Sequence, residues 1–243
     1  MTTAADRFQP TPALLDRALA DGPLDGLIVA SPSNPTGTML DHDTFCDLAA
    51  YCREKGIRLI SDEIYHGITF GWKADSALSF TSDALVVNSF SKYFSMTGWR
   101  LGWMVVPAEL SRAIECLSQN LFISPPSLSQ VAGIAALECG DELDRNVAGY
   151  ARSRELLLEA LPRAGFDQLA PADGAFYLYA DIAKLTNDSE AFCRRMLAET
   201  GVAATPGIDF DPDRGNTFMR FSFSRSTAEM NAAAEALIAW QPR

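Results

Sequence analysis

Four short apolar runs mark the first half of the chain, at residues 26–30, 57–60, 84–87 and 101–106. The first three are nearly continuous in apolar character, which is typical of strands in a parallel sheet that is covered on both faces. The fourth run follows the third too closely for a crossover helix. We therefore expect it to pair with the third in the antiparallel sense.

A helical pattern lies between the first and second runs. Its start is predicted at Asp41 or Asp43, which can cap a helix, and its end at Gly56. Its apolar stripe consists of Phe45, Leu48, Ala49 and Cys52. Strand, helix and strand at this spacing form a βαβ unit, so the first half predicts an α/β fold, with a mostly parallel sheet and helices on both faces.

The second half of the chain has a different order of predicted elements, because its helices and strands do not alternate as βαβ units. Helices are expected at 108–123, 127–138 and from about 143 to Gly165, then at 189–200 and 226–240, and strands at 176–182 and 217–224. This mixture predicts a smaller α+β domain. We place the large domain at residues 1–130 and the small C-terminal domain at residues 131–243.

Composition narrows the class of protein. The chain has 243 residues, of which 48% are apolar and 21% charged, as in ordinary globular proteins, and its net charge is −11. That acidity argues against binding to nucleic acid or to anionic membranes. No apolar stretch reaches 18 residues and the N-terminus does not look like a signal peptide, so a cytoplasmic enzyme is expected.

The number and spacing of the cysteine and histidine residues argue against further classes of protein. The five cysteines are widely spaced without a CxxC pair, which predicts reduced thiols. The two histidines, His42 and His66, have no partner at ligand spacing, so no metal site is expected. A GxSxG motif, which would indicate a serine hydrolase, does not occur in the sequence.

Polar residues follow each of the three predicted parallel strands. Asn34, Asp62 and Lys92 come after the first, second and third strands, respectively. Ligands of open parallel sheets bind outside the carboxyl ends of the strands, so these three groups can converge on one ligand. Taken singly, each has a simpler reading: Asn34 in a turn, Asp62 as a helix cap and Lys92 as a solvated lysine.

The segment around Lys92 resembles the class I/II aminotransferases, which are pyridoxal 5'-phosphate (PLP) enzymes of fold type I, similar to aspartate aminotransferase. The family signature Ser-x-x-Lys, followed by Gly-x-Arg-x-Gly, is matched by Ser89, Lys92, Gly98, Arg100 and Gly102. Further family elements match in order at Asn34–Gly37, Asp62–Tyr65, Gly174–Tyr177 and Arg220–Ser222. The resemblance covers nearly the whole chain and implies a homodimer that acts on an amino acid and a 2-oxo acid.

The resemblance also implies roles in binding the cofactor. Lys92 would form the internal aldimine with PLP and then move the substrate proton. Asp62 would keep the pyridine nitrogen protonated, and Asn34 and Tyr65 would hydrogen-bond the 3-oxygen of the ring. The cofactor phosphate would be bound by Ser89 and Arg100.

Arg220 is the implied partner of the substrate α-carboxylate, together with Asn34. In the predicted strand, Arg220, Ser222 and Ser224 share one face, and Met219, Phe221 and Phe223 share the other. Without the resemblance, the simpler reading is an arginine on the solvent side of a half-buried strand. The aromatic residues near Lys92 and the neighbouring His66 are assigned no catalytic role.

The resemblance begins in the middle of the family's usual chain. Residues 1–130 would form the C-terminal part of the PLP-binding large domain, and no counterpart of the family's N-terminal portion precedes Asn34. Two alternatives to an aminotransferase remain open. One is another fold type I PLP enzyme, such as a carbon–sulfur β-lyase, and the other is a truncated, non-catalytic dimerising or binding module.

Overall fold

The computed structural model describes residues 2–240, which fall into two compact units. Unit 1 runs to Ser33 and then from Met39 to Asp144, whereas unit 2 contains Asn34–Thr38 and the chain from Arg145 onward. The chain therefore passes from one unit to the other more than once. Each unit is described by itself below.

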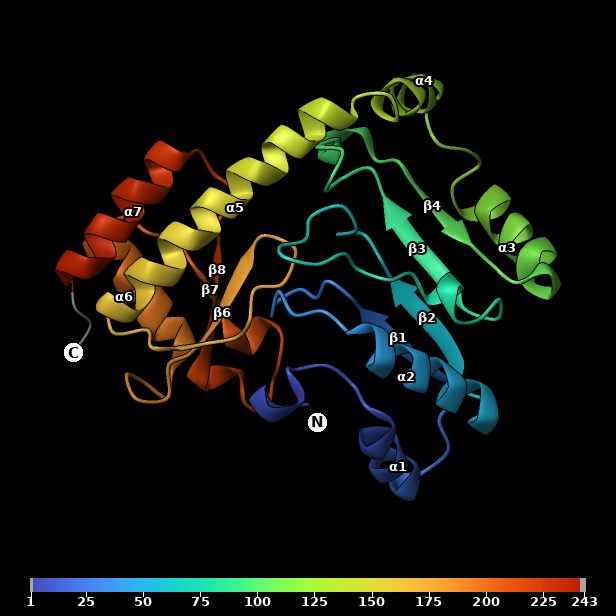
Figure 1. The fold of residues 1–243 in the computed structure, drawn as a ribbon, viewed down its shortest axis with the longest axis horizontal. Coiled ribbons are helices and arrows are strands. Elements are labelled where there is room, and N and C mark those ends of the chain that lie inside the picture. Colours follow the sequence, from blue (N-terminus) through green and yellow to red (C-terminus); the bar gives the residue numbers. More distant parts are fainter. Residues whose placement is uncertain (1, 241–243) are drawn as a thin grey trace. The chain divides into compact units, whose positions relative to one another are not determined.

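A four-stranded sheet forms the centre of unit 1 (Figure 1). Its strands are β1 (Gly26–Ala30), β2 (Arg58–Asp62), β3 (Leu85–Ser89) and β4 (Gly102–Val105), in that spatial order. The first three are parallel and β4 is antiparallel to β3, as the spacing of the apolar runs predicts. This parallel register brings the carboxyl ends of β1, β2 and β3 to the same edge of the sheet.

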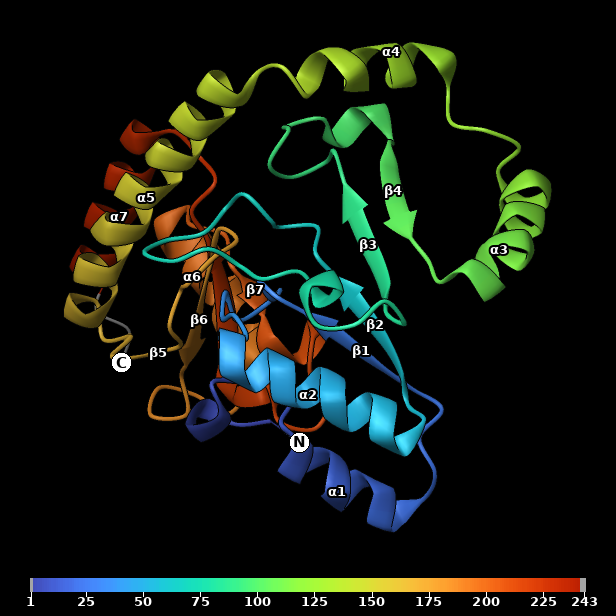
Figure 2. The same ribbon diagram turned by 45° about the vertical axis from the view of Figure 1, so that its right-hand side comes forward.

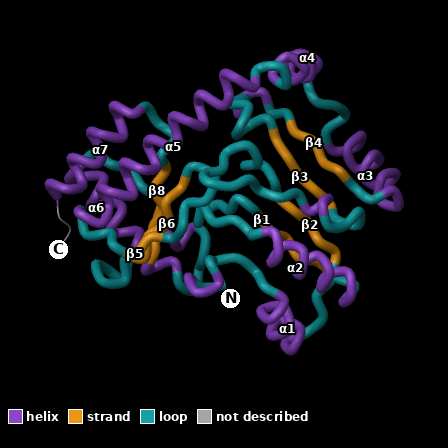
Figure 3. The backbone as a smooth tube through the Cα atoms, in the orientation of Figure 1, coloured by secondary structure: helices purple, strands orange, loops and turns teal. Residues whose placement is uncertain are grey.

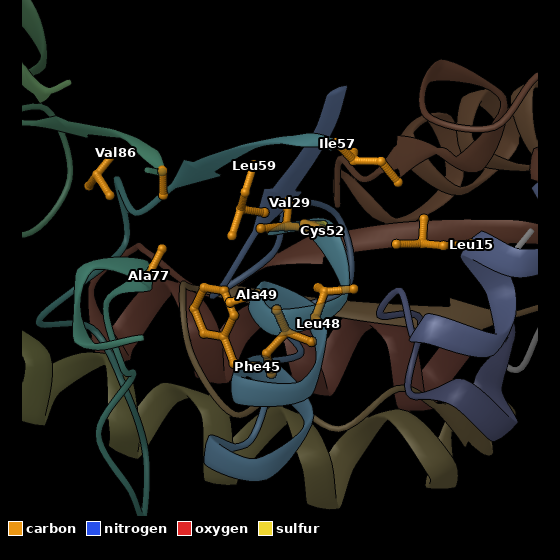
Figure 4. Close-up of a cluster of buried hydrophobic side chains, with 12 residues drawn as sticks. Leu15, Val29, Phe45, Leu48, Ala49, Cys52, Ile57, Leu59, Ala77 and Val86 are labelled. Carbon is orange, nitrogen blue, oxygen red and sulfur yellow. The ribbon is translucent and has the colours of Figure 1, made fainter. Parts of the chain in front are cut away.

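Two helices, α1 (Pro12–Asp21) and α2 (His42–Lys55), pack on one face of this sheet. The Asp41 side chain accepts a hydrogen bond from the Thr44 amide and so caps α2, which ends at Gly56 in the left-handed conformation. The predicted stripe of α2 is buried against the sheet. Figure 4 shows these side chains beside Val29 and Leu59 of the strands.

The opposite face of the sheet is only partly covered by the described residues. Ile28 of β1 is 72% exposed and Met104 of β4 is 44% exposed, although both side chains are apolar. The expectation that the first strands are buried on both faces is therefore wrong for β1. The physical reason is that, within residues 2–240, α1 and α2 bury only the face that carries Val29.

Helices α3 (Ala108–Leu121) and α4 (Ser127–Ala136) follow β4. Ser129 donates a hydrogen bond to the Trp99 carbonyl oxygen, and Gly133 packs against Phe90 and Leu101. These contacts attach α4 to unit 1. Both helices therefore belong to unit 1, and the last division between the two units falls after Asp144.

Unit 2 contains an antiparallel sheet with the order β5-β6-β8-β7. Its strands are β5 (Gln168–Leu169), β6 (Tyr177–Asp181), β7 (Thr205–Pro206) and β8 (Phe218–Ser222). Its helices are α5, which spans Gly140–Arg163 and begins within unit 1, α6 (Ser189–Thr200) and α7 (Thr227–Trp240). Figures 2 and 3 show α5 and α7 running side by side.

The core of unit 2 lies between its sheet and these helices. Phe166 is fully buried and its ring contacts Phe192 of α6 and Phe221 of β8. Met219 and Phe221 are buried while Ser222 is exposed, so β8 has the alternation that its sequence predicts. The Arg220 side of β8 faces away from this core.

Five short 3-10 helices complete the described elements: Ala4–Asp6, Ala77–Ser79, Thr97–Trp99, Gly207–Asp209 and Gly215–Thr217. None of the helices within residues 2–240 has the length and apolar character needed to cross a membrane. With a mainly parallel sheet followed by an antiparallel α+β unit, the predicted fold class is confirmed.

Candidate active site

Asp62 is the last residue of β2 and lies at the carboxyl edge of the sheet of unit 1. It pairs in register with Ala30 of β1 and Val87 of β3, and its Oδ1 accepts a hydrogen bond from the Ile64 amide at 3.2 Å. This bond closes an Asx turn, which fixes the carboxylate where the chain leaves the strand.

The electrostatic surroundings of Asp62 are those of a partly desolvated carboxylate. Burial raises its pKa above the ordinary value, whereas the Ile64 amide, the Lys92 ammonium and His66 act in the opposite direction. Burial is the largest of these effects. The fold thus holds a carboxylate at a position where its charge depends on nearby cations.

Lys92 lies in the loop after β3, where its carbonyl oxygen accepts a hydrogen bond from the Ser95 amide at 3.0 Å. Its Nζ is 5.4 Å from the centre of the Tyr65 ring, which is 3% exposed. An ammonium over an aromatic face is favourable, and the distance lies within the usual range for such contacts. The structure therefore brings Asp62, Tyr65 and Lys92 together in unit 1.

Ser89 and Arg100 belong to the two ends of the same loop. Ser89 Oγ donates to the Leu101 carbonyl oxygen at 3.3 Å and accepts from the Ser91 amide at 3.0 Å. The exposed Arg100 has a φ of 53°, and its Nη1 donates to the Thr97 carbonyl oxygen at 3.1 Å. A positive φ at a residue with a Cβ costs about 1 kcal/mol or more, so the surrounding loop must hold Arg100 in place.

Gly102 explains why the loop signature ends in glycine. A Cβ at this position would lie 2.7 Å from the Asn88 carbonyl oxygen of the neighbouring strand. Any larger residue would push β4 away from β3, and would displace the loop that carries Lys92 and Arg100.

Asn34 and Arg220 form a second group, which lies in unit 2. Arg220 Nη1 donates to Asn34 Oδ1 at 2.5 Å, and Nη2 donates to Thr205 Oγ1 at 3.1 Å. Because a guanidinium can only donate, the amide oxygen of Asn34 faces Arg220 and its NH2 group remains for another acceptor.

Aromatic rings surround the same guanidinium. Arg220 Cζ lies 4.3 Å from the centre of the Tyr177 ring and 4.8 Å from that of Phe210. Its Nε is buried and has no hydrogen-bond partner among the described protein atoms. The strand therefore presents a half-buried and only partly hydrogen-bonded guanidinium, which is a suitable partner for a carboxylate.

Comparison with known families decides the classification of the chain. The family model described as aminotransferase class I and II matches residues 1–237. The chain belongs to this aminotransferase family.

Relatives within the class I and II aminotransferases include two with assigned substrates. A valine–pyruvate aminotransferase of Mycobacterium tuberculosis is 49% identical over 97% of this chain and 61% of its own length. An aspartate aminotransferase of Sulfurisphaera tokodaii is 32% identical over 82% of this chain and 51% of its own length. This chain thus spans about 60% or less of the length of these two relatives.

Solved aminotransferase structures show the same fold. An aminotransferase from Mycobacterium tuberculosis matches with a TM-score of 0.95 and 48% identity. The match covers 99% of this chain and 63% of the M. tuberculosis chain. A double mutant of the Thermus thermophilus aspartate aminotransferase has a TM-score of 0.88 and 31% identity over 98% of this chain. It is covered over 62% of its own length.

Sequence reasoning left several neighbours of the candidate residues unassigned. Thr205, Tyr177 and Phe210 contact Arg220, but they come from separate segments that no local pattern links. Glu63 and His66 are also neighbours of Asp62, and both lie within four residues of it in the sequence. The signal for them is a carboxylate directly after a buried strand, with a histidine three residues later.

Proposed function

We propose that this chain carries the catalytic residues of a PLP-dependent aminotransferase, which moves an amino group from an α-amino acid to a 2-oxo acid. The observation that carries the proposal is the position of Lys92, over the Tyr65 ring and near enough to the partly desolvated Asp62 carboxylate to lower its pKa, in a chain of the aminotransferase family. An amine beside a carboxylate at one sheet edge is the donor set that binds and activates a pyridine aldehyde.

The residues present fit pyridoxal 5'-phosphate. Lys92 supplies the amine, Asp62 the carboxylate for the ring nitrogen, and Tyr65 a phenol within the same unit. Ser89 and Arg100, at the two ends of one loop, supply a hydroxyl and a guanidinium for the phosphate. When bound, the cofactor supplies an electron sink for the substrate α-carbon.

Each of the proposed cofactor-binding residues has a distinct task in this scheme. Lys92 Nζ holds the cofactor and later carries the proton that leaves the substrate α-carbon. Asp62 provides a fixed negative charge, which keeps a proton on the ring nitrogen. Tyr65 and Asn34 are assigned as hydrogen-bond donors that orient the cofactor ring.

Arg220 is assigned the substrate α-carboxylate, with Asn34 as its helper. The guanidinium is already fixed by Asn34 and Thr205 and by two aromatic rings, so little side-chain entropy is lost when an anion binds. The buried and unpartnered Nε supports this role, because a guanidinium without its full set of acceptors gains by meeting a carboxylate.

Valine as amino donor and pyruvate as acceptor are the first substrates to test, since the M. tuberculosis relative at 49% identity is named for this pair. A homodimer is the proposed assembly, which light scattering can check. A cytoplasmic location is also proposed, and the five free cysteines agree with a reducing compartment.

The decisive experiment is a titration of the purified protein with PLP. A visible absorption band should appear on binding, and Lys92→Ala should remove it and lower amino transfer from valine to pyruvate by at least about 10³-fold. Lys73→Ala, which changes a lysine outside the signature, is the matched control and should leave the band intact. If the wild-type chain gives no band at any PLP concentration, the proposal fails.

A further inference from the structure

Two consecutive side chains of the loop after β3 rest on the same turn of unit 1. Lys92 Nζ lies over the Tyr65 ring, and the ring of the next residue, Tyr93, lies against Gly67. A Cβ on Gly67 would lie 2.6 Å from Cδ2 of Tyr93, so the ring sits directly on the glycine backbone. The loop of the proposed reactive amine is therefore in contact with the segment that follows Asp62.

The turn beneath these two side chains is firmly held. Tyr65 is 3% exposed, and its carbonyl oxygen accepts a hydrogen bond from the Ile68 amide at 2.9 Å. Gly67 has a φ of +90°, a conformation that residues with a Cβ rarely adopt, and Ile68 is fully buried. This turn gives the loop a fixed surface on which to pack.

The hydroxyl end of the Tyr93 side chain is held by helix α5. It donates a hydrogen bond to Asp144 Oδ1 at 2.6 Å. Asp144 still belongs to unit 1 and follows the buried Leu143 near the start of α5. Burial, and then this hydrogen bond, raise the pKa of Tyr93 to about 12, so the phenol keeps the proton that it donates at neutral pH.

The loop between these two attachments has its own internal hydrogen bonds. The Ser95 amide donates to the Lys92 carbonyl oxygen at 3.0 Å, and Thr97 Oγ1 donates to the Ser91 carbonyl oxygen at 2.7 Å. These bonds fix the shape of the loop backbone, and Tyr93 attaches that backbone to the rest of unit 1 on two sides. Because Tyr93 adjoins Lys92 in the chain, a shift of its ring also moves the Lys92 backbone.

We propose that Tyr93 is a positioning residue, which holds the Lys92 amine over the Tyr65 ring. It does so because its own ring is fixed between Gly67 and Asp144. The proposal deepens the aminotransferase function and rests on it for the use of the amine. Tyr93 does not touch the reacting atoms in this scheme and acts through Lys92 alone. An amine that is fixed in advance needs less reorganisation during the reaction.

The first test follows Lys92 directly, in protein without PLP. The chain has four lysines, so labelling with ¹³C-lysine gives a simple spectrum, in which Lys92→Ala identifies the signal. The ring current of Tyr65 should shift the ε-methylene protons of Lys92 upfield of those of the other lysines. In Tyr93→Phe, which removes only the hydroxyl group, about half or more of this shift should be lost, because α5 no longer holds the ring.

Variants of the partner provide the controls for this test. Asp144→Ala should reproduce the loss, whereas Asp144→Asn keeps an acceptor oxygen and should keep the shift. The matched control is Tyr51→Phe, since Tyr51 also donates to an aspartate, Asp16, within unit 1. This control should leave the Lys92 signal unchanged. A Lys92 signal that is the same in Tyr93→Phe and in the wild-type protein would overturn the proposal.

The second test changes the contact on the other side of the ring. Gly67→Ala places a Cβ against Tyr93 and should displace the ring, and with it the Lys92 signal. Gly71→Ala is the matched control, because Gly71 has a similar φ of +87°, but a Cβ there would meet no other atom of residues 2–240 within 4 Å. The backbone strain is thus comparable, and equal Lys92 signals in the two variants would contradict the proposal.

The third test uses the enzyme with PLP. Tyr93→Phe should lower kcat for amino transfer from valine to pyruvate about 10-fold, because the amine is less well oriented. The KM for valine should change little, since Arg220, the proposed carboxylate partner, lies in unit 2. Asp144→Asn and Tyr51→Phe should both keep the wild-type kcat. An unchanged kcat in Tyr93→Phe, or an equal loss in Tyr51→Phe, would refute the positioning role.

These measurements separate the two proposals. The first two use protein without PLP, so a wild-type chain that takes up no PLP would sink the aminotransferase function, while the Lys92 signal would still decide whether Tyr93 holds the amine. Conversely, amino transfer that is insensitive to Tyr93→Phe would support the aminotransferase function and reject the positioning role.

Discussion

Asn34 and Arg220, which are 186 positions apart in the sequence, are joined by a hydrogen bond from Arg220 Nη1 to Asn34 Oδ1. Asn34 follows β1 of unit 1, yet Asn34–Thr38 packs with unit 2. The Gly37 carbonyl oxygen accepts from the Gly174 amide at 2.9 Å, which anchors the same segment. Asn34 is thus held beside Arg220, the proposed substrate-binding residue, within unit 2.

Arg220→Lys should damage substrate binding more than the chemical step. Lysine lacks the planar fork that reaches Asn34 and Thr205 at once, so we expect the KM for the amino acid to rise about 10- to 100-fold with a smaller change in kcat. Steady-state kinetics with valine and pyruvate measure this split.

The control for that variant is Arg225→Lys. Arg225 is exposed and its nearest acidic partner, Glu229, is 3.9 Å away, so the exchange should leave both constants unchanged. Equal effects in the two variants would remove Arg220 from the substrate site.

Gly37→Ala should weaken the attachment of the 34–38 segment. A Cβ there would lie 2.7 Å from the Tyr177 carbonyl oxygen, in a residue with a φ of +69°. We expect a loss of about 2–4 kcal/mol in the free energy of unfolding, seen as a lower Tm.

Gly56→Ala is the matched control, because Gly56 also has a φ of +69°, but a Cβ there would meet no other atom of the described residues within 4 Å. It should cost only about 1 kcal/mol. If both variants melt alike, the close approach to Tyr177 contributes nothing.

Asp62→Asn should stabilise the protein at neutral pH while it abolishes activity. Burial raises the pKa of Asp62, so this carboxyl favours the fold when protonated, and that stability is lost as the pH rises through its folded pKa. The variant should therefore have a higher Tm than the wild type at pH 7, with the difference vanishing near pH 3.

Asp41→Asn provides the contrast. The hydrogen bond from the Thr44 amide is the largest effect on Asp41 and lowers the pKa of its carboxyl. The charge of Asp41 therefore stabilises the fold, and removing this charge should not raise the Tm at pH 7. Calorimetry of the three proteins without PLP measures the differences. An Asp62→Asn protein that is less stable than wild type at pH 7 speaks against a strained carboxylate.

Phe166→Ala should be among the most destabilising single changes in unit 2. The ring is fully buried between Phe192 and Phe221, and its removal should cost about 3–5 kcal/mol. Phe122→Ala removes the same side chain where it is 74% exposed, and should change stability by less than about 0.5 kcal/mol. Urea unfolding of both variants compares them, and a small effect at Phe166 contradicts the described core.

Local patterns in the sequence were sufficient to place most of the strands and helices, but they did not predict α1, β5 or β7. The stripe of α2 and the alternation along β8 are governed by near neighbours in sequence, and both are present in the structure. The antiparallel β4 followed from the short link after β3, which leaves no room for a crossover.

Features that depend on distant contacts could not be read in the same way. The packing of Asn34 with Arg220 joins segments that no periodicity connects. The attachment of α4 to unit 1 depends on Gly133 fitting against Leu101, which is a matter of shape. The contact between His66 Nε2 and the Ser31 carbonyl oxygen likewise joins two segments that lie 35 positions apart in the sequence.

The path of the chain between its two units has a consequence for limited proteolysis. The chain crosses between them after Ser33, after Thr38 and after Asp144. A single cut at the last crossing would leave Gly37 hydrogen-bonded to Gly174 and Asn34 to Arg220, each bond then joining one fragment to the other. The nicked protein should co-migrate as one species under native conditions, and a fragment that starts at Arg145 would lack a piece of its own unit.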